Sequence, residues 1–257
     1  IIAKNIEAST KIVDLEGCDF YIIATKALHL EESVKNLKGK IDLNAPLITI
    51  QNGLGAGDII VKHMPKNILI LGVAEGFGAS LIAPGHVTHT ANNKIRLGSI
   101  SQKPGEKKLE NIVSAWRSGG LKTEIYENIE QLIWEKLLCN VTVSGPCSIF
   151  GCNVKELLNN KEYWEFALKC MQEAYYVGLA KSIPFSFDDP IEYVTEFAKR
   201  VGSAKPSMLQ DFETKRKTEI DFINGAIPPL AAKYKISTPF NDRVCKIIHD
   251  AEKPIKS

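Results

Sequence analysis

Short apolar runs and amphipathic stretches alternate along the first part of the chain. Runs rich in branched apolar residues are typical of strands buried on both faces, while apolar positions three and four apart indicate helices. This pattern predicts strands at 19–27, 46–51 and 67–75, with helices at 29–41 and 55–64 between them. The order β-α-β-α-β is typical of an α/β sheet layer.

The pattern changes after residue 75, where β segments follow one another. Residues 84–98 begin with a Pro-Gly turn, alternate between apolar and polar residues, and contain an Asn-Asn pair at 92–93. Alternation on both sides of such a pair predicts a second turn and a hairpin-like β segment. A helix at 109–120 and a short strand at 121–126 are predicted to complete this part of the chain.

From residue 127 onward the apolar spacing is almost wholly helical. Helices are predicted at 127–140, 154–180 (with a kink), 191–201 and 207–225, and the segments 228–236 and 241–253 finish the fold. Glycines and a proline predict a loop or break at 144–153. The sequence therefore predicts an α/β domain at 1–126 followed by an all-α domain at 127–257.

The helix at 127–140 carries the first candidate residues. Positions 129, 132, 133, 136, 137 and 140 share one face, and all are Ile or Leu except Lys136 and Asn140. Trp134 and Leu138 lie on the opposite side, so the helix is predicted to be buried on both sides. A lysine in this place either extends to solvent along its aliphatic stem or faces a cleft, where it can act as a catalytic acid.

Glu219 is a second polar residue on an apolar stripe. On the predicted helix 207–225 it shares a face with apolar residues that include Met208 and Ile223. This is costly for a carboxylate unless it is paired or lies at a ligand, so a buried ion pair and a binding site are both open interpretations. Ser207 begins the same helix, where it can serve as an N-cap or as a ligand-binding hydroxyl.

Lys26 and Asn52 follow the first two predicted strands, at the edge of an open α/β sheet where ligands bind. A lysine there can contact a phosphate and an asparagine a ribose, although a solvated lysine and an asparagine in a turn are equally consistent. The glycines of Gly53–Gly57 come next, but their GxGxG spacing differs from the GxGxxG of a dinucleotide-binding loop. A tight turn that allows a close backbone approach is the favoured interpretation.

Composition and charge exclude several classes of protein. The chain of 257 residues is 44% hydrophobic and 24% charged with a formal net charge of +2, which gives no reason to expect nucleic acid or an acidic membrane as a partner. No apolar run is long enough to cross a bilayer. The 6 scattered cysteines are predicted to be reduced, mostly buried thiols of a cytoplasmic protein. His86 and His89 are placed on opposite faces of an alternating segment, so no metal site is predicted.

Several segments of the chain, taken together, resemble the ketopantoate reductase (2-dehydropantoate 2-reductase) family. They are KALHLEESV, TIQNGLG, GHVTHT, WEKLLCN and PSMLQDFETKRKTEIDFINGAI, of which the last is the most specific. The resemblance covers essentially the whole chain. It implies a Rossmann-like NADP-binding domain at 1–126 and a helical domain at 127–257 for substrate binding and for forming a homodimer. Because Ile1 begins in mid-pattern, the family's first βαβ piece with its GxGxxG turn is expected to be missing from these residues.

The resemblance also implies a reaction. Members of the family transfer hydride from NADPH to the ketone of a 2-oxo acid, here expected to be 2-dehydropantoate in pantothenate biosynthesis, while a lysine protonates the forming alkoxide. Lys136 matches that catalytic lysine, and Glu219 matches an acidic residue beside the cofactor ribose and the active site. Lys26 and Asn52 match residues that contact the cofactor, and Asn52 is expected to lie near the reacting centre.

Substrate binding is assigned by the resemblance to a set of polar residues. They are Asn52, Asn140, Ser207 and Asn153. The sequence departs from the family at Ser144 and Ala204, where members have further asparagines, and Asn153 stands in for a third. Since polar groups reject a wrong substrate strongly only where they are present, a reductase of another branched 2-oxo acid stays open as an alternative. The missing phosphate loop favours a second alternative, a non-catalytic relative acting as a binding or dimerisation module, because the pyrophosphate would lose its main anchor.

Overall fold

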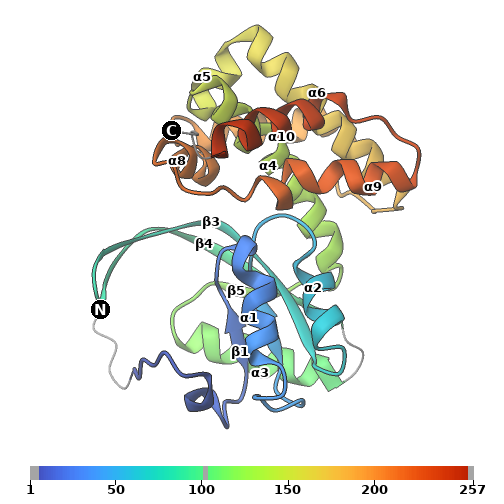
Figure 1. Ribbon diagram of the computed structural model, residues 1–257. Coiled ribbons are helices and arrows are strands. Elements are labelled where there is room, and N and C mark those ends of the chain that lie inside the picture. Colours follow the sequence, from blue (N-terminus) through green and yellow to red (C-terminus); the bar gives the residue numbers. More distant parts are fainter. Residues whose placement is uncertain (1–5, 101–103, 254–257) are drawn as a thin grey trace. The chain divides into compact units, whose positions relative to one another are not determined.

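The computed structural model describes residues 6–100 and 104–253 (Figure 1). Contacts divide the chain into two compact units. Among the described residues, one unit contains those before 52 together with 56–129, and the other contains Asn52–Gly55 together with those from 130 onward. The first unit is built on a β-sheet and the second is helical. This confirms the predicted fold class, a Rossmann-like α/β domain followed by a helical domain.

Within the described residues, the sheet of the first unit has five strands in the order β1-β2-β3-β4-β5. They are β1 (Tyr21–Ile23), β2 (Leu47–Thr49), β3 (Leu69–Ala83), β4 (His86–Ser99) and β5 (Thr123–Ile125). The pairs β1–β2, β2–β3 and β4–β5 are parallel, whereas β3 and β4 are antiparallel. The predicted strands 19–27, 46–51 and 121–126 are therefore confirmed, with ladders shorter than the apolar runs.

Helices cover both faces of this sheet (Figure 1). Leu47 and Ile48 are neighbours in β2 and point to opposite faces. Leu47 is buried with residues of α1 (Leu30–Leu37) and α2 (Ala56–His63), while Ile48 is buried with residues of α3 (Pro104–Ser118). Two short 3-10 turns, η1 (Ile12–Leu15) and η2 (Ala27–His29), precede β1 and α1. The connections through α1 and α2 explain why β1, β2 and β3 run in parallel.

β3 and β4 form one long hairpin that extends beyond the other strands (Figure 1). The chain reverses at Pro84-Gly85, where Gly85 has a φ of 75°. The predicted turn at 92–93 is wrong, because Asn92 pairs with Phe77 inside the ladder and β4 continues to Ser99. An Asn-Asn pair favours a turn only locally, and pairing with the extended β3 outweighs that preference here.

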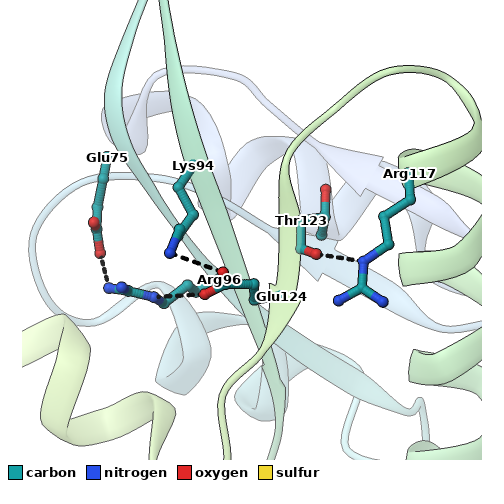
Figure 2. A network of polar contacts seen from close by, with 6 residues as sticks. All are labelled: Glu75, Lys94, Arg96, Arg117, Thr123 and Glu124. Atoms are coloured by element: carbon teal, nitrogen blue, oxygen red, sulfur yellow. Dashed lines mark hydrogen bonds and ion pairs between the residues drawn. The ribbon is translucent and has the colours of Figure 1, made fainter.

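Charged side chains connect three strands near the base of the hairpin, as Figure 2 shows. Arg96 on β4 pairs with Glu75 on β3 and, through Nε at 3.4 Å, with Glu124 on β5. Lys94 Nζ lies 2.8 Å from the same Glu124 carboxylate, and these two cations hold the pKa of Glu124 below its usual range, Lys94 more strongly. Arg117 on α3 donates to a β5 carbonyl at 2.7 Å, which attaches the helix to the edge strand.

The second unit consists of helices and short turns. Its helices are α4 (Ile129–Phe150), α5 (Val154–Asn159), α6 (Lys161–Ala180), α7 (Pro190–Val201), α8 (Ser207–Glu213), α9 (Ile227–Lys233) and α10 (Pro239–Glu252), and its 3-10 turns are η3 (Ile220–Phe222) and η4 (Asn224–Ala226). The final segments 228–236 and 241–253 thus fold into α9 and α10. No helix in the described part of the chain is long and apolar enough to span a membrane.

Helix α4 continues through most of the segment 144–153, so the predicted break is wrong. A Cβ on Gly145 would lie 2.5 Å from Val244 of α10 and 2.6 Å from Asn224, so this glycine serves close packing and not a turn. Pro146 lies inside the helix without an N–H to donate. Residues 141–148 are all buried, and this packing keeps the helix continuous past the proline.

The predicted helix 154–180 consists of two helices, so its kink is a complete break. Asn160 separates them, and its side-chain oxygen accepts a hydrogen bond from Tyr163 N at 3.1 Å. Asparagine side chains compete with the backbone for such donors, which favours a cap over a helix interior. The aromatic-rich segment therefore begins its own helix, α6.

The predicted helix 207–225 ends early, with α8. Lys215 adopts a left-handed conformation with a φ of 55°, through which a right-handed helix does not continue. Arg216 closes the end, since its backbone N donates to Asp211 O at 2.8 Å and its Nε to Asp211 Oδ1 at 2.9 Å. The prediction that Glu219 shares a helical face with Met208 and Ile223 is therefore wrong.

Candidate functional site

Lys136 and Asn140 lie one turn apart on α4 and are both half-buried. The helix around them is buried on opposite sides, as the spacing predicts, with Leu137 and Trp134 each 1% exposed. A long cationic side chain keeps its aliphatic stem among apolar neighbours and directs its ammonium outward. These two residues are therefore polar groups at the boundary of a dense core, in a helix that holds their backbone rigidly.

Glu219 lies just before the η3 turn and is half-buried. Its neighbour Thr218 donates from N and Oγ1 to Glu252 Oε1 at 2.8 and 2.7 Å, and the carbonyl of Glu219 accepts from Phe222 N at 3.0 Å. Ile220, on the other side, is fully buried. The backbone of Glu219 is thus fixed on both sides by a turn and by α10, although it does not lie on a helix.

The loop that carries Asn52 packs against this same turn. Leu54 N donates to Phe222 O at 2.8 Å. Gly53 has a φ of 85°, and a Cβ on it would lie 2.0 Å from the carbonyl oxygen of Phe222. The tight turn predicted for these glycines is therefore a close approach to protein backbone. It brings Asn52, which is half-buried, to the turn that begins at Glu219.

Ser207 is the first residue of α8 and is exposed. The N-cap position belongs to Pro206, so the interpretation of Ser207 as an N-cap is wrong. The next two residues, Met208 and Leu209, are buried at 2% and 1% exposure and anchor the start of the helix. The Ser207 hydroxyl is consequently displayed at a helix N-terminus, where partial positive charge favours an anion.

One hydrophobic cluster supports all these elements. For Lys136, Asn140, Ser207 and Glu219, the next residue in the sequence is a buried member of this cluster. Leu54, two residues after Asn52, is partly buried and packs against the cluster. These neighbours are Leu137, Val141, Met208, Ile220 and Leu54. The backbones that carry Lys136, Asn140, Ser207, Glu219 and Asn52 are therefore anchored to the same core. The sequence predicts each residue separately, and the fold brings their supporting segments together.

Lys26 belongs to the sheet unit and is exposed. It occupies the cap position before η2, directly after the carboxyl end of β1. Gln51, at the end of β2, donates from Nε2 to Thr25 O at 3.0 Å and so ties the ends of the two strands together. An exposed ammonium at this edge of a parallel sheet is chemically suited to a phosphate.

Asn153 has a structural role that the sequence analysis does not predict. Its Oδ1 accepts from Glu156 N at 3.0 Å, and its own N donates to Glu156 Oε2 at 2.8 Å. These reciprocal bonds form a capping box at the start of α5. Of the two departures from the family pattern, Ser144 is buried within α4 and Ala204 is exposed.

Titratable groups elsewhere give little sign of metal or thiol chemistry. No group of three or more His, Cys, Asp or Glu side chains among the described residues could hold a metal ion. Burial raises the pKa of Cys139 and of Cys245 to about 12 and also raises that of Cys170, so these thiols stay protonated at neutral pH. All 6 cysteines are free thiols, as predicted, and 4 of them are buried.

The helical unit contains a buried polar network that the sequence pattern does not predict. Asn224 and Asn241 are both 0% exposed, and Glu173 is 7% exposed. The available signal for Asn224 was its place in the specific segment TEIDFING. Glu173 and Asn241 gave a weaker signal, since each lies on a helix among ordinary polar and apolar neighbours.

Two family models match the chain. The model of ketopantoate reductase PanE/ApbA matches residues 2–102, and the model of the C-terminal part of ketopantoate reductase PanE/ApbA matches residues 128–252. Together they cover both units, and the second contains every candidate residue of the helical unit except Asn52, which lies in the first.

Individual proteins show the same similarity. The chain is 28% identical over 258 residues to the 2-dehydropantoate 2-reductase of Lactococcus lactis subsp. lactis (strain IL1403), covering 98% of this chain and 81% of that protein. The structure of D-mandelate dehydrogenase with NADH and anilino(oxo)acetate is similar with a TM-score of 0.83 and 27% identity, covering 92% of this chain and 77% of that one. A PanE/ApbA family ketopantoate reductase from Ralstonia eutropha has a TM-score of 0.87 at 19% identity, covering 96% and 80%, which shows the fold alone.

Proposed function

Since the chain belongs to the ketopantoate reductase family, we propose that it reduces 2-dehydropantoate to pantoate with NADPH, as a cytoplasmic enzyme of pantothenate biosynthesis. The observation that carries the proposal is the pair Lys136 and Asn140, half-buried one turn apart on α4, where the three residues between them are buried. The same hydrophobic cluster supports the segments of Glu219, Ser207 and Asn52.

The proposed chemistry is a hydride transfer coupled to a proton transfer. NADPH, when bound, supplies the hydride that forms the new C–H bond at the ketone carbon. The ketone oxygen keeps the electron pair of the carbonyl π bond and receives a proton from the Lys136 ammonium, which leaves that lysine neutral until solvent reprotonates it. Asn140, one turn further along α4, donates a hydrogen bond to the 2-oxo acid and fixes its orientation.

Three more residues of the helical unit have proposed roles. The Ser207 hydroxyl, at the N-terminus of α8, donates to the substrate carboxylate. Asn52 contacts the nicotinamide and the substrate through its amide. Glu219 accepts a hydrogen bond from a ribose hydroxyl of the cofactor.

The cofactor is proposed to be NADPH, and Lys26 to contact one of its phosphates. Support comes from the exposed Lys26 ammonium at the carboxyl ends of β1 and β2, the edge at which open α/β sheets bind ligands. Asn153 does not enter the proposed site, since its side-chain oxygen already caps α5. A homodimer remains part of the proposal as the assembly implied by the family resemblance.

A reductase of another 2-oxo acid is the second candidate. It is favoured by Ser144 and Ala204, which stand where family members have substrate asparagines, and by the likeness to D-mandelate dehydrogenase with anilino(oxo)acetate. The chemistry is unchanged and only the pocket differs. A panel of branched and aromatic 2-oxo acids, compared by kcat/KM, separates the two candidates.

The test follows the loss of NADPH absorbance when the natural protein is given ketopantoate and the other 2-oxo acids. Lys136→Ala is expected to lower kcat by roughly 10²–10⁴-fold, the range for loss of a general acid. The matched control is Lys161→Ala, a side chain 89% exposed on α6, which is expected to leave kcat unchanged. If no 2-oxo acid causes oxidation of NADPH, the proposal that the protein is a reductase is contradicted, and a non-catalytic binding module is favoured. Equal activity of both variants would remove Lys136 from the mechanism.

A further inference from the structure

A chain of buried polar side chains links four elements of the helical unit. Glu173 on α6 accepts from Asn241 Nδ2 at 2.7 Å, Asn241 Oδ1 accepts from Asn224 Nδ2 at 3.0 Å, and Asn224 Nδ2 also donates to Val141 O at 3.1 Å. The chain thus runs from α6 through α10 and η4 to α4. We call Glu173, Asn241 and Asn224 the polar ladder.

The carboxylate of Glu173 also caps α10 from outside that helix. It accepts from Phe240 N at 2.9 Å and from Asn241 N at 3.0 Å, which are first-turn donors that a helix leaves unsatisfied. The position before the helix, Thr238, makes no side-chain cap bond. Negative charge at a helix N-terminus is favourable, so this end of the ladder is held by several donors at once.

The hydrogen bonds of the ladder define one orientation for each amide. Asn241 Nδ2 donates to Glu173 and to Cys170 O at 2.9 Å, so a flipped amide would place its oxygen against two acceptors. Asn224 Nδ2 likewise faces two acceptors, Asn241 Oδ1 and Val141 O. The ladder can therefore form in one arrangement only, with its direction set by the carboxylate.

The ladder ends beside the candidate catalytic helix positions. Val141, whose carbonyl it binds, follows Asn140 directly and lies just over one turn from Lys136. Asn224 Oδ1 has no hydrogen-bond partner and lies where a side chain on Gly145 would collide with it, at 2.6 Å from the Cβ position. The close contact with Gly145, without a side chain between, fixes how far η4 stands from α4.

The other side of η4 leads to the turn that begins at Glu219. Asn224 begins η4 two residues after Phe222, whose carbonyl accepts from Leu54 N. A shift of Asn224 relative to α4 would therefore carry with it the turn of Glu219 and the loop of Asn52. The hydrogen bonds of a buried polar network specify one arrangement of the elements that they join.

We propose that Glu173, Asn241 and Asn224 are positioning residues, which hold the Glu219–Phe222 turn and the Asn52 loop in register with Lys136 and Asn140 on α4. This inference rests on the proposed function and deepens it. It names the groups that align the Glu219 turn and the Asn52 loop with the catalytic positions on α4. None of the three is proposed to touch substrate or cofactor.

The test compares Asn224→Ala with Val194→Ala, a fully buried residue of the same hydrophobic cluster that lies outside the ladder. Both remove part of a buried side chain and are expected to lower stability. Hydrogen exchange of the Leu54 amide, which reports its bond to Phe222, is measured in each variant without any ligand. Asn224→Ala is expected to accelerate this exchange on the order of 10-fold more than Val194→Ala does. It should also lower kcat/KM for ketopantoate by about 10-fold or more.

Two results overturn the inference. One is equal acceleration of Leu54 exchange in the two variants, and the other is an unchanged Leu54 amide in Asn224→Ala. The exchange experiment tests the positioning role without any turnover, whereas the assay of the wild-type protein tests the proposed reaction. Failure of the positioning inference can therefore be distinguished from failure of the proposed function. If Asn224→Ala does not fold, Asn241→Leu replaces it, because this change removes both the Oδ1 acceptor and the Nδ2 donor of the middle ladder residue at nearly constant volume. Unchanged Leu54 exchange in that variant equally contradicts the proposal.

Discussion

At the scale of single residues, the candidate site depends on a few polar side chains and on one glycine, Gly53, which has no side chain. Lys136 and Asn140 are found from spacing alone, because they interrupt an apolar helical face. The approach of Gly53 to Phe222 has no such signal, since the two residues are far apart in sequence and only the folded chain brings them together. Sequence patterns record periodicity within an element and not contacts between distant ones.

Replacing Gly53 by alanine tests that approach. The new Cβ would meet the Phe222 carbonyl, and the left-handed backbone adds strain of about 1–3 kcal/mol. Gly39→Ala is the matched control, because Gly39 has a φ of 74° with nothing within 4 Å of the Cβ position, so it carries the strain alone. Urea unfolding should give a larger loss for Gly53→Ala. Equal losses would mean that the contact with Phe222 does not limit the site.

At the scale of elements, local signals succeed where the segment decides its own structure and fail where packing decides. The apolar runs give β1 and β2, and the amphipathic stretches give α1 and α10. Gly145 and Pro146 predict a break, yet close packing against α10 turns the glycine into a helix contact. Lys215 shows the reverse case, because good helix formers surround it and the helix still ends there.

At this scale, a substitution of Asn153 tests whether the residue has a structural role or a substrate-binding role. Loss of a cap costs about 1 kcal/mol, so Asn153→Ala should lower the melting temperature by about 2–4 °C in a chain of this size. The KM for the 2-oxo acid should stay unchanged. Asn160→Ala, which removes the cap of α6, is the matched control with the same expected loss. A KM that rises for Asn153→Ala alone would restore the substrate contact that the family resemblance implies.

At the scale of the whole molecule, burial rather than sequence context decides which groups can react. The sequence predicts reduced, mostly buried thiols, but it gives no means of ranking them. The structure separates one exposed cysteine, Cys18, from four buried ones and from Cys245, which is half-buried. Since a thiolate is the reacting form, a thiol whose pKa is raised by burial is doubly protected, by access and by protonation.

A thiol-labelling experiment reads this ranking directly. Cys18 is expected to react rapidly with an aromatic disulfide reagent in the native protein, while the other thiols react only after unfolding. Burial raises the pKa of Cys139 and Cys245 to about 12, so raising the pH from 7 to about 9 should not make these two thiols react in the native protein. Cys18→Ser should abolish the fast phase. Rapid native-state labelling of Cys170 would contradict the packing of the helical core.

The membership of Asn52–Gly55 in the helical unit has a consequence for recombination between related genes. These residues are encoded between β2 and α2 but pack with the helical residues. A crossover near residue 130 would combine the helical unit of one parent with the loop of another, and the carbonyl of Phe222 would then meet a foreign sequence. Chimeras should therefore be functional more often when residues 52–55 and the helical unit come from the same parent. In recombination, this short loop belongs with the helical unit although it is encoded within the sheet unit.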